Sequence, residues 1–226
     1  MSARNVGTVD LDDGVPRELK EKLEKTRMPA EDRARYCGDS MWGMYNFTAI
    51  RALMLADGDW ARANETCIQV EKLLTGFSAA AFYEEHEAGS PADVAMNQPM
   101  TRAGIADEFR ATSDARNAAT ADIIIMMNSY PDANYRVLTW TPEEAVYQIC
   151  DSCPRKDSLD AVNELSRKRG MPSPLDGYDL FGICAAGAEG YAMAMPGVLG
   201  EARQGMCRGD DLCEFRYYMK EVAPSD

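Results

Sequence analysis

Cysteine is the residue type in this 226-residue chain with the clearest chemical potential, and most of it lies toward one end. A thiolate is a strong nucleophile once its pKa falls below the free value of about 8.5, and it also binds zinc and iron. Because five of the seven cysteines follow residue 149, the C-terminal part is where chemistry is expected. The full set is Cys37, Cys67, Cys150, Cys153, Cys184, Cys207 and Cys213.

Histidine chemistry is largely excluded, because the chain holds a single histidine, His86. A zinc site built from several histidines and the facial triad of non-haem iron each need at least two. The sequence also lacks the nucleophile-elbow motif of serine hydrolases. His86 lies in the acidic run Tyr83–Glu87 and is expected at the surface.

The charge balance narrows the range of partners. Lys and Arg number 24 against 37 Asp and Glu, which gives a net charge of −13. That acidity argues against nucleic acid and anionic membrane as partners. No run of about 18 apolar residues and no N-terminal signal pattern is present, and an odd cysteine count speaks against a disulfide framework. We therefore expect a cytoplasmic protein, for which exposed strand edges and apolar helices make a homodimer plausible.

Helical periodicity dominates the first half of the chain. A flexible N-terminal arm is expected over residues 1–15 and a helical region over 16–130. Within that region the pattern predicts helices at 17–26, 29–56, 60–87 and 102–128. Residues 131–226 are expected to form an α+β region that bears most of the cysteines and packs with the helices as one unit.

The second half mixes strand and helix patterns. Strands are predicted at 135–140 and 145–150, followed by a helix from a Ser158 cap to about 169 and another at 178–195. Residues 199–207 and 212–220 read as a hairpin around a Gly-Asp-Asp turn. The prediction is an α+β fold, with a helical N-terminal half packed on a small antiparallel sheet that has two helices in the C-terminal half.

The closing hairpin resembles that of a known family. Residues 209–217, GDDLCEFRY, are similar to the "GDD-x-C-[DE]-F-R-[FY]" hairpin of the L-2-amino-thiazoline-4-carboxylic acid hydrolase-like family, and V4R (4-vinyl reductase) domains carry a related hairpin. The family also places a cysteine at an upstream strand end, where Cys150 or Cys153 stands, and one in the preceding helix, where Cys184 stands. Over about residues 145–220, the resemblance implies a small-molecule hydrolase or lyase that acts on a C–N bond of a carboxylate-bearing ring or amide.

Hydrolysis by cysteine needs a nucleophile, a proton shuttle and a donor to the developing charge. Cys184 is the preferred nucleophile, because it lies in a predicted helix near apolar aromatic residues. Two further sets complete this hypothesis: acids that move the proton (Asp210, Asp211 and Glu201) and arginines that hold the substrate carboxylate (Arg203 and Arg208). Such an enzyme would require no cofactor.

Other interpretations remain open. The family's acidic residue after the helix cysteine is replaced here by Ala185, which favours a non-catalytic small-molecule binding or sensing module of V4R type. Its pocket would be lined by Trp42, Tyr45, Phe181 and Tyr191. A third interpretation is a metal-dependent enzyme that holds zinc or iron at Cys150, Cys153, Cys207 and Cys213. Cys184 on an apolar helix face also fits simple core packing.

Overall fold

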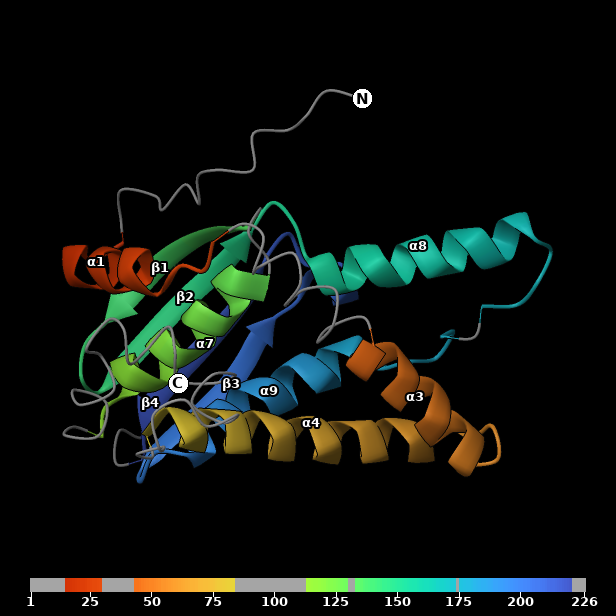
Figure 1. The fold of residues 1–226 in the computed structure, drawn as a ribbon, viewed down its shortest axis with the longest axis horizontal. Coiled ribbons are helices and arrows are strands. Elements are labelled where there is room, and N and C mark those ends of the chain that lie inside the picture. The colour runs from red at the N-terminus through yellow and green to blue at the C-terminus, as the bar shows by residue number, and fades with distance from the viewer. Residues whose placement is uncertain (1–14, 30–42, 84–112, 130–132, 174, 221–226) are drawn as a thin grey trace.

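A computed structural model describes residues 15–29, 43–83, 113–129, 133–173 and 175–220 of the chain (Figure 1). It contains both helices and an antiparallel sheet, so the predicted α+β fold is confirmed, including the two helices of the C-terminal half. The helices are α1 (Arg17–Thr26), α3 (Gly43–Leu55), α4 (Trp60–Tyr83), α7 (Ala115–Ser129), α8 (Pro154–Lys168) and α9 (Leu180–Met193). The strands are β1 (Asn134–Trp140), β2 (Glu144–Cys150), β3 (Val198–Gln204) and β4 (Cys213–Met219), with a short 3-10 helix at Met206–Arg208.

Aspartate side chains begin three of the helices. Asp59 accepts a hydrogen bond from the Ala61 N–H at 2.9 Å at the start of α4. Asp114 accepts one from the Arg116 N–H at 2.8 Å before α7, and Asp179 caps α9 in the same way. Each carboxylate satisfies an N–H group that would otherwise lack a helical partner and complements the positive end of the helix dipole.

The sheet has the strand order β1-β2-β4-β3, and every neighbouring pair is antiparallel. Tyr147 and Phe215 are register partners on the central strands, and their rings stack with centroids 5.3 Å apart. Side chains alternate between the two faces of such strands. The face that carries Tyr147, Phe215 and Tyr217 contacts α7, and the opposite face carries a charged network around Arg216.

Helices α7 and α9 lie against one face of the sheet, and α4 lies against α9 on the side away from the sheet (Figure 1). Two glycines allow close packing around α9. A Cβ at Gly190 would lie 2.6 Å from the Lys72 carbonyl oxygen on α4, and a Cβ on Gly200 of β3 would overlap the Ala188 carbonyl oxygen of α9. The largest core cluster joins α1, α7, α9 and all four strands, so both halves of the chain share one core.

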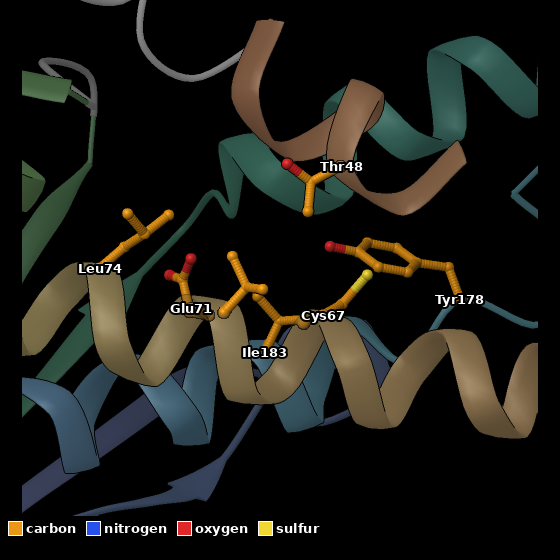
Figure 2. Close-up of a pocket in the computed structure, with 7 residues that line it drawn as sticks. Thr48, Cys67, Glu71, Leu74, Tyr178 and Ile183 are labelled. Carbon is orange, nitrogen blue, oxygen red and sulfur yellow. The ribbon is translucent and has the colours of Figure 1, made fainter. Parts of the chain in front are cut away.

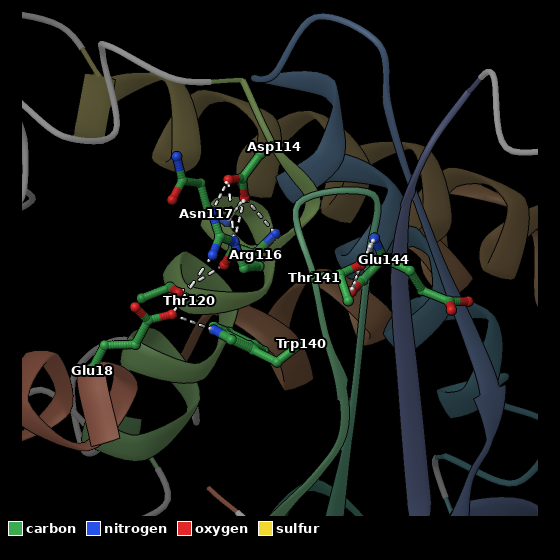
Figure 3. A network of polar contacts seen from close by, with 8 residues as sticks. All are labelled: Glu18, Asp114, Arg116, Asn117, Thr120, Trp140, Thr141 and Glu144. Carbon is green, nitrogen blue, oxygen red and sulfur yellow. Dashed lines mark hydrogen bonds and ion pairs between the residues drawn. The ribbon is translucent and has the colours of Figure 1, made fainter. Parts of the chain in front are cut away.

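A polar joint connects α1, α7 and the end of β1 (Figure 3). The Trp140 Nε1–H donates to Glu18 at 3.2 Å, and Arg116 lies 3.7 Å from the same carboxylate. Arg116 also pairs with Asp114 at 2.7 Å. The joint fixes α1 beside the sheet layer, and Val15, at the end of the predicted arm, is buried in the core beside it.

Two helix starts and one strand end differ from the sequence expectation. The helix expected from Ser158 begins at Pro154, because proline is tolerated in the first helical turn, where its missing N–H needs no partner. Of the helix expected over 102–128, the described part begins at Ala115, after the Asp114 cap, and residues 102–112 lie outside the described residues. The strand expected over 199–207 ends at Gln204 and gives way to the 3-10 turn. Residues 1–14, 30–42 and 84–112, with parts of other expected elements, lie outside the described residues.

Within the described part of the chain, every helix is too short or too polar to cross a lipid bilayer.

Candidate active site: a thiol cluster at the start of helix α8

The chain reverses direction immediately after β2. Asp151 has a φ of 71°, and the Ser152 N–H donates to the Cys150 carbonyl at 2.9 Å. Cys153 then becomes the N-cap of α8, and its carbonyl accepts the first helical hydrogen bond, from the Asp157 N–H at 2.9 Å. The turn therefore places Cys153 where backbone N–H groups and the helix dipole favour a negative charge.

Cys213 is the partner of Cys153. It is the first residue of β4 and alternates onto the same sheet face as Phe215 and Tyr217. Its thiol is hydrogen-bonded to the Cys153 sulfur, and both cysteines are buried and reduced. One thiol of such a pair donates and the other accepts, so the two sulfurs are chemically different.

Cys153 is the more acidic thiol of the pair. The hydrogen bond from Cys213 lowers the pKa of Cys153 to about 6, against the opposing effect of burial, with further help from the Lys156 N–H and the positive charge of Arg155. The same hydrogen bond, together with burial, raises the pKa of Cys213 far above its usual range. The hydrogen bond therefore favours the thiolate form of Cys153 and the protonated form of Cys213.

Two more thiols lie near this pair. Cys184 of α9 interacts electrostatically with Cys153 and Cys207, and Cys207 lies in the 3-10 turn before β4. Burial raises the pKa of Cys184 to about 12, although Arg155 partly offsets the effect. Burial also raises the pKa of Cys207. Four sulfurs from distant parts of the sequence thus lie within electrostatic reach of one another, and the raised pKa of Cys184, the predicted nucleophile, favours its protonated form.

A buried ion pair lies beside the cluster. Arg155 Nη2 lies 3.2 Å from Glu71 Oε1, and its Nη1 lies 3.7 Å from the Cys184 sulfur. Both side chains are almost fully enclosed, at 14% and 4% exposure. Neither residue was among the sequence candidates, because they are separated by 84 positions. The one local indication of this site in the sequence is Glu71, a carboxylate on the apolar helical stripe that runs from Cys67 to Leu74.

A pocket opens between α3 and α4 and reaches Glu71 (Figure 2). Its enclosed volume is about 10 Å³, roughly the room that one water molecule needs. Apart from Glu71, its lining is mostly apolar or weakly polar: Thr48, Cys67, Val70, Leu74, Tyr178 and Ile183. Glu71 therefore faces the pocket on one side and Arg155 on the other.

Arg208 and Phe181 lie at the outer rim of the cluster. The Arg208 guanidinium carbon lies 3.6 Å from the centroid of the Phe181 ring, a cation–π contact. Phe181 lies close to Gly205, beside which the Cys207 sulfur also lies. Arg208 is exposed and influences the pKa of Cys207, so it is an accessible cation close to the thiols.

Three predicted site residues lie on the other side of the sheet. Glu201 and Arg203 of β3 pair with one another at 3.1 Å, and Glu201 also contacts Arg216 at 3.3 Å. Cys150 alternates to this face as well, in line with Gln148, whose amide bonds Glu214. The sheet therefore separates these residues from Cys153, Cys184 and Cys213.

The predicted acids of the turn have local roles. Asp210 Oδ2 accepts the Gly205 N–H at 2.8 Å and lies 3.5 Å from Arg208 Nη2, so it holds the turn and orients the rim arginine. Asp211 is exposed in the same turn. Tyr191 is buried in the main core, two turns along α9 from Cys184. Tyr45 is part of α3, and Trp42 lies outside the described residues.

Among the residues that the structure describes, no group of three or more His, Cys, Asp or Glu side chains is arranged to hold a metal ion. The predicted metal set is also divided, since Cys150 faces away from Cys153 and Cys213. The cysteines of the cluster are free thiols in this structure.

A second buried anion lies under the sheet. Asp122 of α7 accepts hydrogen bonds from the Tyr147 hydroxyl at 2.6 Å and the Tyr217 hydroxyl at 2.5 Å, both at Oδ2. Burial raises the pKa of Asp122 to about 6, although both tyrosines and Arg155 act to lower it. Its sequence signal was a lone carboxylate in an otherwise apolar helix stretch.

Comparison with known proteins finds no matching family model and no curated protein of similar sequence. A solved structure of trafficking protein particle complex subunit 3 from Naegleria fowleri, covalently bound to palmitic acid, resembles this chain with a TM-score of 0.44 and 15% identity. That likeness covers 92% of this chain and 100% of the other. At this level of similarity it supports no statement about function.

Proposed function

We propose that the protein is a cysteine-dependent hydrolase of a C–N bond in a small carboxylate-bearing ring or amide, with Cys153 as its nucleophile. One observation carries the proposal: Cys153 is the N-cap residue of α8, and the hydrogen bond from Cys213 lowers its pKa. Reactive cysteines are typically found at helix N-termini beside a cation, with a lowered pKa. The resemblance of the closing hairpin to the aminothiazoline-carboxylate hydrolase-like family supports the same reaction class.

The proposed reaction consumes one water molecule. The Cys153 sulfur attacks the amide or amidine carbon and forms an S–C bond, and the C–N bond then breaks. The leaving nitrogen takes a proton from water, and the hydroxide that remains attacks the carbon bound to sulfur. The S–C bond breaks, the thiolate is restored and the product is released. Arg155 contributes by stabilising negative charge at the cluster, as its effect on the Cys153 pKa indicates.

Arg208 is the proposed anchor of the substrate carboxylate. It is exposed at the rim of the cluster and is held in place by the Phe181 ring and by Asp210. A planar guanidinium binds a carboxylate through two parallel hydrogen bonds, which orients the substrate as well as attracting it. In this strongly acidic protein, a local arginine is needed to admit an anionic substrate.

Alkylation of the reduced protein tests the nucleophile. Iodoacetamide at pH 6.5, followed by peptide mass spectrometry, should modify Cys153 first and at least tenfold faster than Cys184. Cys153→Ser should abolish the fast phase, whereas Cys184→Ser should leave it intact. Fast labelling of Cys184 while Cys153 stays unmodified would overturn the assignment of Cys153 as the nucleophile.

Hydrolysis itself is tested with a panel that contains 2-amino-thiazoline-4-carboxylate and several N-acyl amino acids. Turnover is followed by mass spectrometry of the ring-opened or deacylated product. We expect Cys153→Ser to lose turnover and Arg208→Met to raise KM with a smaller change in kcat, because the anchor binds ground state and transition state alike. Turnover that survives in Cys153→Ser would contradict the mechanism.

A second candidate function is non-catalytic binding of a small, partly apolar molecule at the pocket between α3 and α4, which would have to widen to admit it (Figure 2). In that case, a thermal-shift screen of aromatic and aliphatic amines should find ligands that pair with Glu71. Binding should be lost in Val70→Trp, which fills the pocket, and retained in Cys153→Ser. Binding that survives in Val70→Trp and is lost in Cys153→Ser would favour the hydrolase.

A further inference from the structure

We propose that Cys153 and Cys213 form a peroxide-sensitive thiol pair that closes reversibly into a disulfide. The inference goes beyond hydrolysis and does not depend on it, because it requires only the two sulfurs and their surroundings. It assigns a covalent modification site to the junction of α8 and β4.

The backbone places these two thiols together from both sides. Cys213 begins β4 opposite Ile149 of β2, and Cys153 follows Ile149 after the left-handed turn at Asp151. Both residues are buried in the same core cluster, and their free thiols are hydrogen-bonded to one another. Closing the bond therefore shortens an existing sulfur–sulfur contact rather than bringing distant segments together.

The chemistry proceeds in two balanced steps with hydrogen peroxide as the oxidant. The Cys153 thiolate attacks one peroxide oxygen, the O–O bond breaks, and Cys153 sulfenic acid and hydroxide form. The Cys213 sulfur then attacks the Cys153 sulfur, an S–S bond forms, and the displaced hydroxyl leaves as water with the Cys213 proton. In sum, two thiols and one peroxide give one disulfide and two waters.

Cys213 is favoured over the other nearby thiols as the resolving residue. Cys153 raises the pKa of Cys184 and Cys207 through its charge alone, whereas it shares a hydrogen bond with Cys213. Arg155 also contacts the Cys184 sulfur, which directs that thiol toward the guanidinium. The first bond that the Cys153 sulfenic acid can form is therefore with Cys213.

Oxidation would have two consequences. It would remove the thiolate at the N-cap of α8, and with it the proposed nucleophile. It would also join the start of α8 covalently to the start of β4, which are 60 positions apart in the chain. A cross-link that closes a loop of this length typically stabilises a fold by constraining the unfolded chain.

The test uses the reduced full-length protein, kept in EDTA so that stray metal does not mask thiols, and treated with increasing hydrogen peroxide. We expect the free-thiol count to fall by two and peptide mapping without reductant to show Cys153 linked to Cys213. Dithiothreitol should restore both thiols. In Cys213→Ser, the Cys153 sulfenic acid should persist and be trapped by dimedone, whereas Cys153→Ser should give neither product.

Cys184→Ser and Cys207→Ser are the matched controls, and both should still form the 153–213 disulfide. Circular dichroism of every variant checks that it is folded. The proposal is overturned if Cys153 links to another cysteine, if it is oxidised directly to sulfinic acid with Cys213 present, or if both thiols survive peroxide. None of these readouts uses a hydrolase substrate, so failure of the thiol pair and failure of the hydrolase are distinguishable.

Discussion

Asp122 and Cys153 are two buried acids with opposite electrostatic outcomes. Asp122 receives two tyrosine hydroxyl hydrogen bonds, yet burial prevails and raises its pKa to about 6. Cys153 receives one thiol hydrogen bond and a backbone N–H, and these prevail over burial and lower its pKa to about 6. Both groups therefore titrate near the same pH, which is above the usual value for Asp122 and below the usual value for Cys153.

The difference shows that the surroundings of an acid matter more than the number of its donors. Cys153 lies at a helix N-terminus, where a backbone N–H and the dipole stabilise charge without reorganising. Asp122 lies within helix α7, where the backbone N–H groups are already used by the helix itself. Arg155 lowers the pKa of both groups and is the link between them.

Removing the Arg155 guanidinium should have the largest effect on the stability of the fold. Arg155→Met leaves Glu71 buried without the guanidinium, and breaking a buried ion pair in this way typically costs about 3–5 kcal/mol. The variant should also move the pKa of Cys153 upward, so that iodoacetamide labelling at pH 6.5 slows. Urea unfolding and labelling kinetics measure the two effects.

Arg155→Lys and the double variant Arg155→Met/Glu71→Gln sharpen this prediction. The lysine variant keeps a positive charge and should lose less stability and less reactivity. The double variant removes the orphaned carboxylate and should recover part of the stability while its Cys153 labelling stays slow. A single Arg155→Met as stable as the parent would mean that the pair contributes nothing to the fold.

Asp122 should make stability depend on pH in a definite direction. Its folded pKa of about 6 lies above the ordinary value of 3.8, so the folded state holds a proton that the unfolded state releases between those pH values. Protonated Asp122 contributes fully to the free energy of unfolding below about pH 4, and this contribution is lost as the pH rises through about 6. The total is on the order of 3 kcal/mol.

Asp122→Asn should abolish this pH dependence, as measured by urea unfolding at several pH values between 4.5 and 7.5. The stability of the wild type relative to the variant should fall as the pH rises through that window. Asp211→Asn, at an exposed carboxyl in the hairpin turn, is the matched control and should leave the profile unchanged. A wild-type advantage that instead grows with pH would reverse the sign assigned to Asp122.

Cys213→Ala removes the largest contribution to the low pKa of Cys153. If that pKa rises by about one unit, the thiolate fraction at pH 6.5 falls and iodoacetamide labelling should slow about threefold. Half-maximal labelling should move upward from near pH 6. Cys213→Ser keeps a hydrogen-bond donor and should retain most of the rate, and equal rates in alanine and serine variants would show that the helix N-terminus alone sets the reactivity.

The sequence predicts much of this frame but not the contacts that decide its chemistry. The limits of α1 and the pairing of the closing hairpin follow from local patterns, because caps, periodicity and turn residues lie within a few positions of one another. The start of α8 was missed because Ser158 looks like a cap, whereas Cys153 followed by Pro154 is a less common one.

Distance along the chain explains the remaining omissions. Cys150 and Cys153 resemble one motif, yet the left-handed Asp151 between them places Cys150 on the far face of the sheet and Cys153 at the helix start. The roles of Glu71 and Arg155 depend on a contact between α4 and α8, which no local pattern encodes. A carboxylate on an apolar helical stripe is the one local signal that marks such a site.

The smallest expected effect comes from the residue next to Glu71. Lys72 pairs with Glu189 of α9 at 2.5 Å, but both side chains are substantially exposed, at 34% and 50%. Water screens the attraction, so Lys72→Ala should cost less than about 1 kcal/mol in urea unfolding and should weaken further in high salt. Glu189→Ala is the partner control and should cost no more. A loss as large as that of Arg155→Met would mean that contact between α4 and α9, rather than burial of charge, sets the cost at both pairs.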